Sequence, residues 1–450
     1  MALRRPQLLL LLLFVAVNVV LLALADPGCR TVGATCALTA DRTGEMVVDA
    51  LLKYGALVDP EDPSQPYVGH TPGHALVMAA TFLMFGDQSY LPLIVLQLAF
   101  LFASGLLLHK AVDEVLPGYG VIAMALYVFN PNVLAQVQLP QTNALEVPFV
   151  TIAFAAAILF ARRVTLAAAL LCGAAVGIAM LMRPMSQFLV PLLPIVLPVL
   201  VLLGGNPAKW RRAVLYGLAA AGVAIAIASP WVLHMHAAGR GYHMSAPSHE
   251  HLLLLDSLRF LSPEAPGEDV PQRKVAFTQW QLDEMRRLYA DWDSFEVAHQ
   301  EMLLRDHAIA YFRTFPFEPS TMATALAWSW IRFFVAGGEG ELHRLLGLEG
   351  RAAEQPLAFY LVKAVALGTA VLLRILGILG LVELLRRREW GVLLLCTGLI
   401  LLFMAGTFLV GQPRYRVPVE APLVVLATFG IAILMDRLRR PRSVLSMVPR

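Results

Sequence analysis

Runs of about 20 apolar residues recur along this chain from its beginning almost to its end. Of its 450 residues, 58% are hydrophobic and 15% are charged, whereas soluble domains carry about 25% charge. A run of about 20 apolar residues is long enough to cross the hydrocarbon core of a bilayer. The sequence therefore predicts an all-α polytopic membrane protein that contacts membrane lipids.

The basic residues fix how these runs thread the membrane, because short cytoplasmic loops collect Lys and Arg. With about ten transmembrane helices, the basic clusters at the span ends all face the cytoplasm, together with both termini. The predicted spans are residues 8–25, 89–109, 117–137, 143–161, 165–182, 186–204, 213–235, 362–385, 390–410 and 416–436.

Two long segments, 26–88 and 236–356, are then expected on the outer face. Each contains apolar residues at helical spacing, over 71–86 and over 321–335, and an amphipathic helix lying in the membrane interface would suit both. Short re-entrant or packed helices are the alternative. No separate soluble domain or internal repeat is evident, so we predict one membrane domain over residues 1–450, capped by these two outer loops.

The N-terminal segment admits two interpretations. Arg4, Arg5 and the apolar run ending in Ala25 resemble a signal peptide. The run is longer than a typical signal sequence, which favours a retained first helix. Cys29 and Cys36 follow, and a disulfide is permitted there if the loop is periplasmic, although spacing alone leaves the question open.

Three acidic residues stand where lipid would meet water. Asp41 and Glu45 are four residues apart, so they would share one face of a helix. Partial desolvation makes such a carboxylate more basic, and it could take a proton from an acceptor hydroxyl or amine. Ordinary solvated loop acids are the alternative. Glu146 begins the fourth span, where an ionisable side chain is costly, although a helix N-terminus also favours an acid there.

Basic side chains on the outer face oppose the inside bias and so call for an explanation. Arg183 lies at the outer junction of two spans, Arg240 and His243 follow the seventh span, and Arg414 and Arg416 precede the tenth. Arginine grips phosphate through paired hydrogen bonds, so a phosphate leaving group is one explanation. Anionic lipid headgroups are the other.

Several kinds of ligand find no motif in this sequence. The histidines lack the carboxylate spacing of a metal site, and no Gly-rich loop would cradle a nucleotide. The basic residues cluster at helix ends, which argues against a nucleic-acid partner. These observations favour a donor that is already activated, such as a sugar on a lipid phosphate, with no cofactor and no metal.

A series of short motifs, in order over nearly the whole chain, resembles the GT-C glycosyltransferases. The resemblance is to the bacterial branch near the protein O-mannosyltransferases and the lipid A aminoarabinose transferases. The matching pieces are Asp41 with 50–55, His70-Thr-Pro-Gly-His74 with Phe85-Gly86, Asn130-Pro131, the segment from Gly177 to Arg183-Pro184, Pro230-Trp231, Phe315-Pro316 and Arg414-Tyr415-Arg416-Val-Pro418.

The resemblance implies a location in the bacterial cytoplasmic (inner) membrane. It also implies a polyprenyl-phosphate sugar as donor and an active site facing the periplasm or cell exterior. It implies Asp41 as the catalytic base and places the donor phosphate near Arg183, Arg240, Arg414 and Arg416. The acceptor could be a lipid, a polysaccharide or a protein. The predicted pocket further includes His70, His74, Asn143 and Tyr415, and the resemblance implies chemistry without a metal.

The chain also departs from the family pattern. Many relatives carry an acid where this chain has Asn143, and here Glu146 follows one turn later. Two other functions therefore stay open. A transporter or flippase of lipid-linked sugars would place ionisable residues near the bilayer midplane and show paired repeats, but the charges are expected at span ends. A non-catalytic GT-C-like scaffold is the second alternative.

Overall fold

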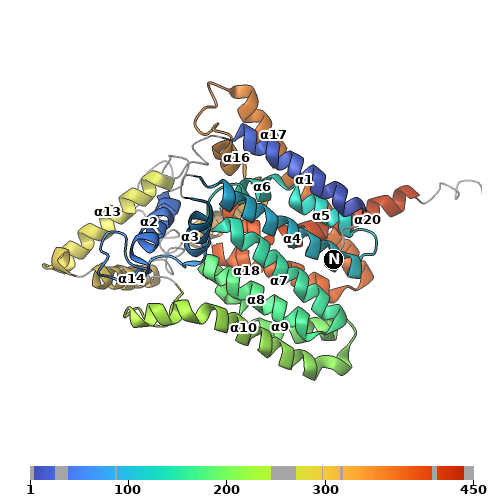
Figure 1. Ribbon diagram of the computed structural model, residues 1–450, viewed down its shortest axis with the longest axis horizontal. Helices are drawn as coiled ribbons and strands as arrows, with labels where there is room; N and C mark the ends of the chain where they lie inside the picture. Colours follow the sequence, from blue (N-terminus) through green and yellow to red (C-terminus); the bar gives the residue numbers. More distant parts are fainter. Residues whose placement is uncertain are drawn as a thin grey trace, which may run out of the picture.

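The computed structural model describes residues 5–25, 39–86, 89–244, 270–295, 297–314, 318–407 and 413–439. Within these ranges the chain is helical, and the one pairing of extended backbone is an isolated bridge between Val58 and Pro66. Most helices run side by side in one bundle, and α2, α13 and α14 lie together at one end of it (Figure 1). Cys29 and Cys36 fall outside the described residues.

The predicted all-α membrane fold is confirmed, but the predicted number of about ten spans is not. Among the described residues, six helices are long and apolar enough to cross a membrane, and α5 with α6 makes a seventh if that bent pair is one span. The six are α1 (Arg5–Leu24), α4 (Leu91–Val115), α7 (Asn143–Arg163), α10 (Trp210–Ala237, with the preceding turn), α17 (Pro356–Arg387) and α20 (Glu420–Arg439, with the preceding turn).

Proline explains two of the differences. The predicted span 117–137 divides into α5 (Gly120–Val128) and α6 (Pro131–Val137), which meet at 55°. Pro131 opens α6, and the Asn130 side chain accepts a hydrogen bond from the Asn132 backbone N–H at 3.0 Å, which caps the new helix.

The predicted span 186–204 is likewise interrupted. A 3-10 helix, η2 (Pro184–Leu189), precedes a short helix, α9 (Leu193–Leu203), with Pro191 and Pro194 near the junction. The apolar helices α8 (Leu166–Met182) and α18 (Trp390–Thr407) are also shorter than the six long spans.

The core of the bundle lies around α7 and α20, because 89% and 83% of the residues in their apolar stretches are buried. Small residues let neighbouring helices approach closely. A Cβ on Gly380 of α17 would lie 1.7 Å from the Leu426 carbonyl oxygen of α20, and one on Gly173 of α8 would lie 2.1 Å from the Ala220 carbonyl oxygen of α10. Close packing of this kind holds helices together where the surrounding lipid is as apolar as they are.

The predicted surface segments 71–86 and 321–335 form the helices α3 (Gly73–Phe85) and α15 (Pro319–Val335). Three further helices accompany them, α2 (Thr39–Tyr54), α13 (Val270–Leu288) and α14 (Val297–Thr314). Trp328, Trp330 and Ile331 of α15 are exposed, and exposed aromatic and apolar side chains of this kind suit a membrane interface.

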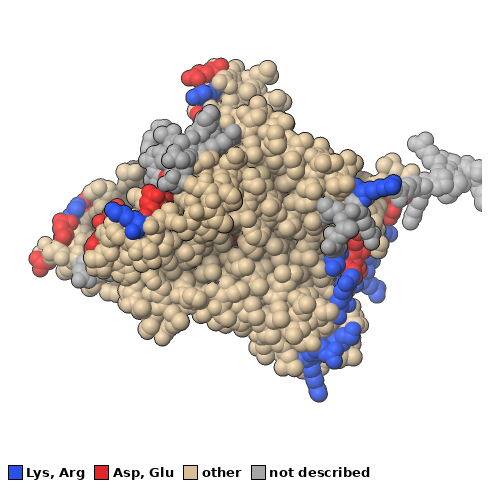
Figure 2. Space-filling view, viewed as in Figure 1, with Lys and Arg blue, Asp and Glu red and all other residues tan. Residues whose placement is uncertain are grey.

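Charge distinguishes the two ends of the bundle. Figure 2 shows Lys and Arg gathered where α9 leads into α10 and where α20 ends. The helix α7 runs between the two ends, with Glu146 in its first turn and Arg162 and Arg163 in its last. By the inside bias of basic residues, the Glu146 end is the expected outer end.

Candidate functional site

The outer end of α7 holds a buried ion pair. The Glu146 side chain is 0% exposed, its Oε1 accepts a hydrogen bond from the Ser186 hydroxyl at 3.0 Å, and its Oε2 lies 3.6 Å from an Arg183 guanidinium nitrogen. Arg183 has extended backbone because Pro184 follows it, and α8 therefore ends at Met182. The pair joins the beginning of α7 to the end of α8 and brings together two residues that the sequence analysis named separately.

Tyr415 completes this arrangement from the C-terminal part of the chain. It lies in the four-residue helix α19 (Pro413–Arg416), and the Arg183 guanidinium carbon is 4.6 Å from the centre of its ring. A guanidinium over an aromatic face is held by the quadrupole of the ring. Arg183 is 19% exposed and Tyr415 is half-buried, so this cation is fixed on two sides without being sealed from the surroundings.

The first outer loop docks on the same place. The Thr71 hydroxyl donates to the Met182 carbonyl oxygen at 3.1 Å. Gly73 lies so close to α8 that a Cβ there would be 2.5 Å from the Leu181 carbonyl oxygen. Burial, together with the charge of Arg183, lowers the pKa of His70. The structure therefore brings His70 into the electrostatic reach of Arg183, and both are predicted site residues.

His74, the other predicted histidine, is enclosed. It is 4% exposed, and its Nε2 atom has no hydrogen-bond partner in the structure. Burial lowers the pKa of His74 to about 4. A neutral, enclosed ring of this kind is suited to packing beneath the loop.

The end of α10 holds the loop from the other side. The His234 ring stacks on Trp231, and its Nε2 is 2.8 Å from the Tyr67 carbonyl oxygen. The Tyr67 hydroxyl in turn accepts a hydrogen bond from the His70 backbone N–H at 2.8 Å. Two predicted phosphate-binding residues, Arg240 and His243, follow the end of α10 and are half-buried.

The predicted catalytic carboxylates Asp41 and Glu45 lie one turn apart on α2, as their spacing predicts. The Tyr90 hydroxyl, at the start of α4, donates to the Glu45 carboxylate. The Asp41 and Arg414 side chains are outside the described part of the structure, although both residues belong to helices. The proposed roles of Asp41 and Arg414 therefore stay predictions.

Buried amides surround the beginning of α7. The Asn143 side chain is 4% exposed and donates to the Gln136 side-chain oxygen at 3.3 Å. The Gln141 side chain donates to the same oxygen. Asn143, the position where many relatives have an acid, thus belongs to an amide cluster one turn from Glu146.

Arg416 occupies a different environment from the one predicted for it. It is fully buried and donates to Glu420 at 2.8 Å and to the carbonyl oxygens of Phe333 and Ala336. Arg374 also donates to Glu420, at 3.1 Å. Sequence reasoning missed Arg374 and Glu420. The signal was available, because both are ionisable residues within predicted spans. The expectation that charges sit only at span ends is wrong for Arg374, near the middle of α17.

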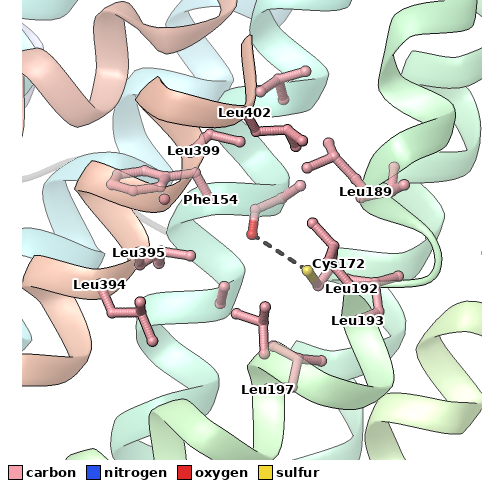
Figure 3. A pocket seen from close by; sticks show the side chains of 16 residues that line it. Phe154, Cys172, Leu189, Leu192, Leu193, Leu197, Leu394, Leu395, Leu399 and Leu402 are labelled. Atoms are coloured by element: carbon pink, nitrogen blue, oxygen red, sulfur yellow. Dashed lines mark hydrogen bonds between the residues drawn. The ribbon is translucent and has the colours of Figure 1, made fainter. Parts of the chain in front are cut away.

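An apolar cavity of about 160 Å³ lies between α7, α8, α9 and α18 (Figure 3). Leucine side chains from α9 and α18 face one another across it. Gly398 of α18 also lines it, and a Cβ there would meet no atom within 4 Å. Leu189, at the end of η2, is among the lining residues, and η2 begins directly after Arg183. The short helix η2 thus runs from Arg183 to the wall of the cavity.

In the described ranges, no three His, Cys, Asp or Glu side chains come together as ligands of a metal ion would.

Comparison with known proteins identifies the architecture. The family described as dolichyl-phosphate-mannose-protein mannosyltransferase matches residues 69–234, a range that includes His70, His74, Glu146 and Arg183. No curated protein sequence is significantly similar to the chain.

Solved structures extend the likeness to the whole chain. The apo oligosaccharyltransferase of Archaeoglobus fulgidus is 14% identical, with a TM-score of 0.57 over 97% of this chain and 51% of that protein. The same archaeal enzyme, AglB, in complex with an inhibitory peptide and a dolichol-phosphate is 13% identical, with a TM-score of 0.51 over 95% of this chain and 50% of that one. The chain therefore spans about half the length of these enzymes.

An ArnT from Cupriavidus metallidurans is 14% identical, with a TM-score of 0.41 over 94% of this chain and 77% of that chain. The family match over residues 69–234 and the shared fold agree in pointing to the GT-C glycosyltransferases. The resemblance seen in its motifs is confirmed, and the chain is a multi-pass membrane protein with this fold.

Proposed function

We propose that this protein is an inverting glycosyltransferase that moves a sugar from a polyprenyl-phosphate donor to an acceptor at the outer face of the bacterial cytoplasmic membrane. One observation carries the proposal. A half-enclosed arginine, Arg183, is held by Glu146 and Tyr415 at the expected outer end of the bundle, and the 3-10 helix that follows it ends at Leu189, which lines an apolar cavity between membrane helices.

A lipid phosphate needs a cation at the membrane surface and an apolar path below it. The Arg183 guanidinium would bind the phosphate, and its fixed position spares the cost of ordering it. The leucine-lined cavity would take the first part of the isoprenoid chain. Arg240, His243 and Arg414 remain the further candidates for the phosphate, since all three follow the outer ends of predicted spans.

The proposed reaction has three parts, which are proton removal, attack on the sugar and departure of the lipid phosphate. Asp41 takes the proton of an acceptor hydroxyl or amine, whose electron pair attacks the anomeric carbon from the face opposite the phosphate. The bond from that carbon to the phosphate oxygen breaks, and the polyprenyl phosphate leaves with its electron pair, stabilised by arginine. Holding lipid and acceptor at one surface supplies part of the rate.

Contacts among the described residues support this arrangement of α2 beside Arg183. Glu45, one turn from Asp41, is held by Tyr90. The helix α2 packs on α3, and α3 begins at Gly73, which lies against the last turn of α8. Only two chain positions then separate that contact at Leu181 from Arg183.

The test is transfer of label from radioactive polyprenyl-phosphate sugars by the purified protein in lipid, with lipid, polysaccharide and peptide acceptors. We expect wild type to transfer label, Asp41→Asn to lose transfer by about 100-fold or more while still binding undecaprenyl phosphate, and Arg183→Ala to lose binding. Glu389→Gln, at the opposite end of α7 where Glu389 pairs with Arg162, is the matched control.

Two results would contradict the proposal. Movement of a lipid-linked sugar across a proteoliposome membrane without transfer would indicate a transporter. Full complementation of a deletion strain by Asp41→Asn, with no transfer by the wild type, would indicate a scaffold.

A further inference from the structure

A second charged cluster lies directly behind Tyr415 and is closed to solvent. Arg416 is 0% exposed and Glu420 is 1% exposed. Arg416 Nε and an Arg374 guanidinium nitrogen both donate to the same Glu420 oxygen, at 2.8 and 3.1 Å. Two cations thus share one carboxylate, and removal of the carboxylate would leave both uncompensated in a low-dielectric interior.

The bend between α5 and α6 supplies the remaining donors to this carboxylate. The Asn130 and Asn132 side-chain amides donate to the two Glu420 oxygens at 3.1 and 3.2 Å. Gly338 packs against Asn132 so closely that a Cβ would lie 1.9 Å from its side-chain oxygen. Glu420 is therefore held by the bend between α5 and α6, by Arg374 of α17 and by Arg416, one turn before it.

The same two arginines cap the end of α15. Arg416 donates to the Phe333 and Ala336 carbonyl oxygens, and Arg374 Nε donates to the Phe334 carbonyl oxygen at 3.1 Å. The last carbonyls of a helix lack intrahelical partners and carry partial negative charge, so guanidinium groups stabilise them. The cluster is thus the place where α15, expected at the membrane surface, is attached to the membrane helices.

Tyr415 is the link to the phosphate site. It precedes Arg416 in the four-residue helix α19, and its ring lies 4.6 Å from the Arg183 guanidinium carbon. Three hydrogen bonds from Arg416 to protein groups leave little freedom for its neighbour. Arg416 itself is too deeply buried to meet a lipid phosphate, so any effect on the donor must pass through Tyr415.

We propose that Arg416, Glu420 and Arg374 are positioning residues that hold the Tyr415 ring against Arg183 and thereby set the grip on the donor phosphate. The inference rests on the proposed function. It also gives α15 a role, because the carbonyl groups at its end are part of the structure that places Tyr415. Displacement of α15 would loosen Arg183 without touching it.

The experiment is a double-mutant cycle between Glu420→Gln and Tyr415→Leu, with undecaprenyl phosphate as the probe. Dissociation constants are measured by calorimetry on purified protein in detergent, and kcat and KM are measured with the sugar-loaded donor. We expect Glu420→Gln to weaken binding about tenfold in the presence of Tyr415 and to have no further effect beside Tyr415→Leu. KM for the donor should rise more than kcat falls.

Controls separate positioning from folding. Glu389→Gln removes one partner of an ion pair at the other end of α7 and should leave the dissociation constant unchanged. Where Glu420→Gln does not fold, Arg374→Lys replaces it in the cycle, because a lysine keeps the charge but lacks the two separate guanidinium nitrogens that donate to Glu420 and to the Phe334 carbonyl.

The outcomes distinguish this inference from the function beneath it. Wild type that fails to bind undecaprenyl phosphate would overturn the proposed function. In the other case, wild type binds undecaprenyl phosphate and Arg183→Ala weakens that binding. The positioning role alone is then overturned if Glu420→Gln or Arg374→Lys leaves the dissociation constant unchanged, or if its effect simply adds to that of Tyr415→Leu.

Discussion

Arg183 and Glu146 face each other across 3.6 Å at the outer end of the bundle, and the carboxylate is wholly buried while the guanidinium is not. This asymmetry assigns different tasks to the two residues. Glu146 cannot meet a substrate directly, but it can hold Arg183 through their contact and fix η2 through Ser186. The acid one turn beyond Asn143 is thus better suited to orienting a cation than to exchanging a proton with an acceptor.

Glu146→Gln should loosen Arg183 without unfolding the protein. A glutamine can still accept the Ser186 hydrogen bond, but it no longer balances the guanidinium charge. We expect binding of undecaprenyl phosphate to weaken about tenfold, since charge-assisted contacts of this kind contribute about 1.5–3 kcal/mol. Calorimetry on the variant and on Glu389→Gln makes the comparison. An Asp41-like loss of turnover with unchanged donor affinity would instead assign Glu146 to the chemical step.

Gly73→Ala should detach the first outer loop from α8. The added Cβ would lie 2.5 Å from the Leu181 carbonyl oxygen, a backbone atom that cannot rotate away. Overpacking of this kind costs about 1–3 kcal/mol, and we expect a lower thermal unfolding midpoint and reduced sugar transfer. Gly222→Ala in α10 is the matched control, because a Cβ there meets no atom within 4 Å. Equal midpoints for the two variants would contradict the docking.

His74 should make the protein less stable in mild acid. Burial lowers its pKa in the folded protein from 6.5 to about 4, so below pH 6.5 the unfolded chain binds a proton that the folded chain does not. The free energy of unfolding therefore keeps its full value above the unfolded-state pKa of 6.5. It decreases as pH falls from about 6.5 towards 4, by up to about 1.4 kcal/mol per pH unit. Burial lowers the pKa of His70 and of His307 as well, and these act in the same direction.

The variant His74→Phe isolates the contribution of His74 to this pH dependence of stability. The midpoint of thermal unfolding in detergent should fall less steeply with decreasing pH in His74→Phe than in wild type. His299→Gln, at an exposed position on α14, should keep the wild-type slope. A His74→Phe slope as steep as that of wild type would show that the ring is not held neutral in the folded protein.

The sequence was sufficient for much of the fold. Apolar length and the placement of basic residues predict the helical bundle and its two ends, because both patterns are local. The breaks in the third and sixth predicted spans were harder to place. An interior proline bends a helix or ends it according to whether neighbours satisfy the freed backbone groups, and here the Asn130 cap and the turns of η2 do so.

The candidate site was predictable in part, because some of its residues stand in local sequence patterns. Arg183, Glu146, His70 and Tyr415 were each selected as outer-face residues or family-like motifs, and the structure places Arg183 close to the other three. Sequence could not assign Arg416, because its surroundings are set by residues far away along the chain. Arg374 lies 46 positions before Glu420, with which it pairs, and Phe333 lies 83 positions before Arg416. Such pairings arise only from helix packing.

The cavity in Figure 3 supplies the last prediction, in which stability and function should move in opposite directions. Gly398→Leu would place a side chain into about 160 Å³ of apolar space, where a Cβ meets no atom within 4 Å. Filling such space commonly stabilises a fold by about 0.5–2 kcal/mol, so the unfolding midpoint should rise. If the isoprenoid chain of the donor occupies the cavity, affinity for undecaprenyl phosphate should fall, while affinity for a phosphate carrying a chain of two isoprene units or fewer should change little. Gly222→Leu, on an exposed stretch of α10, controls for the added apolar side chain. Equal loss for long and short chains would show that the substitution acts on the phosphate end, and unchanged affinity for both would place the lipid chain elsewhere on the bundle.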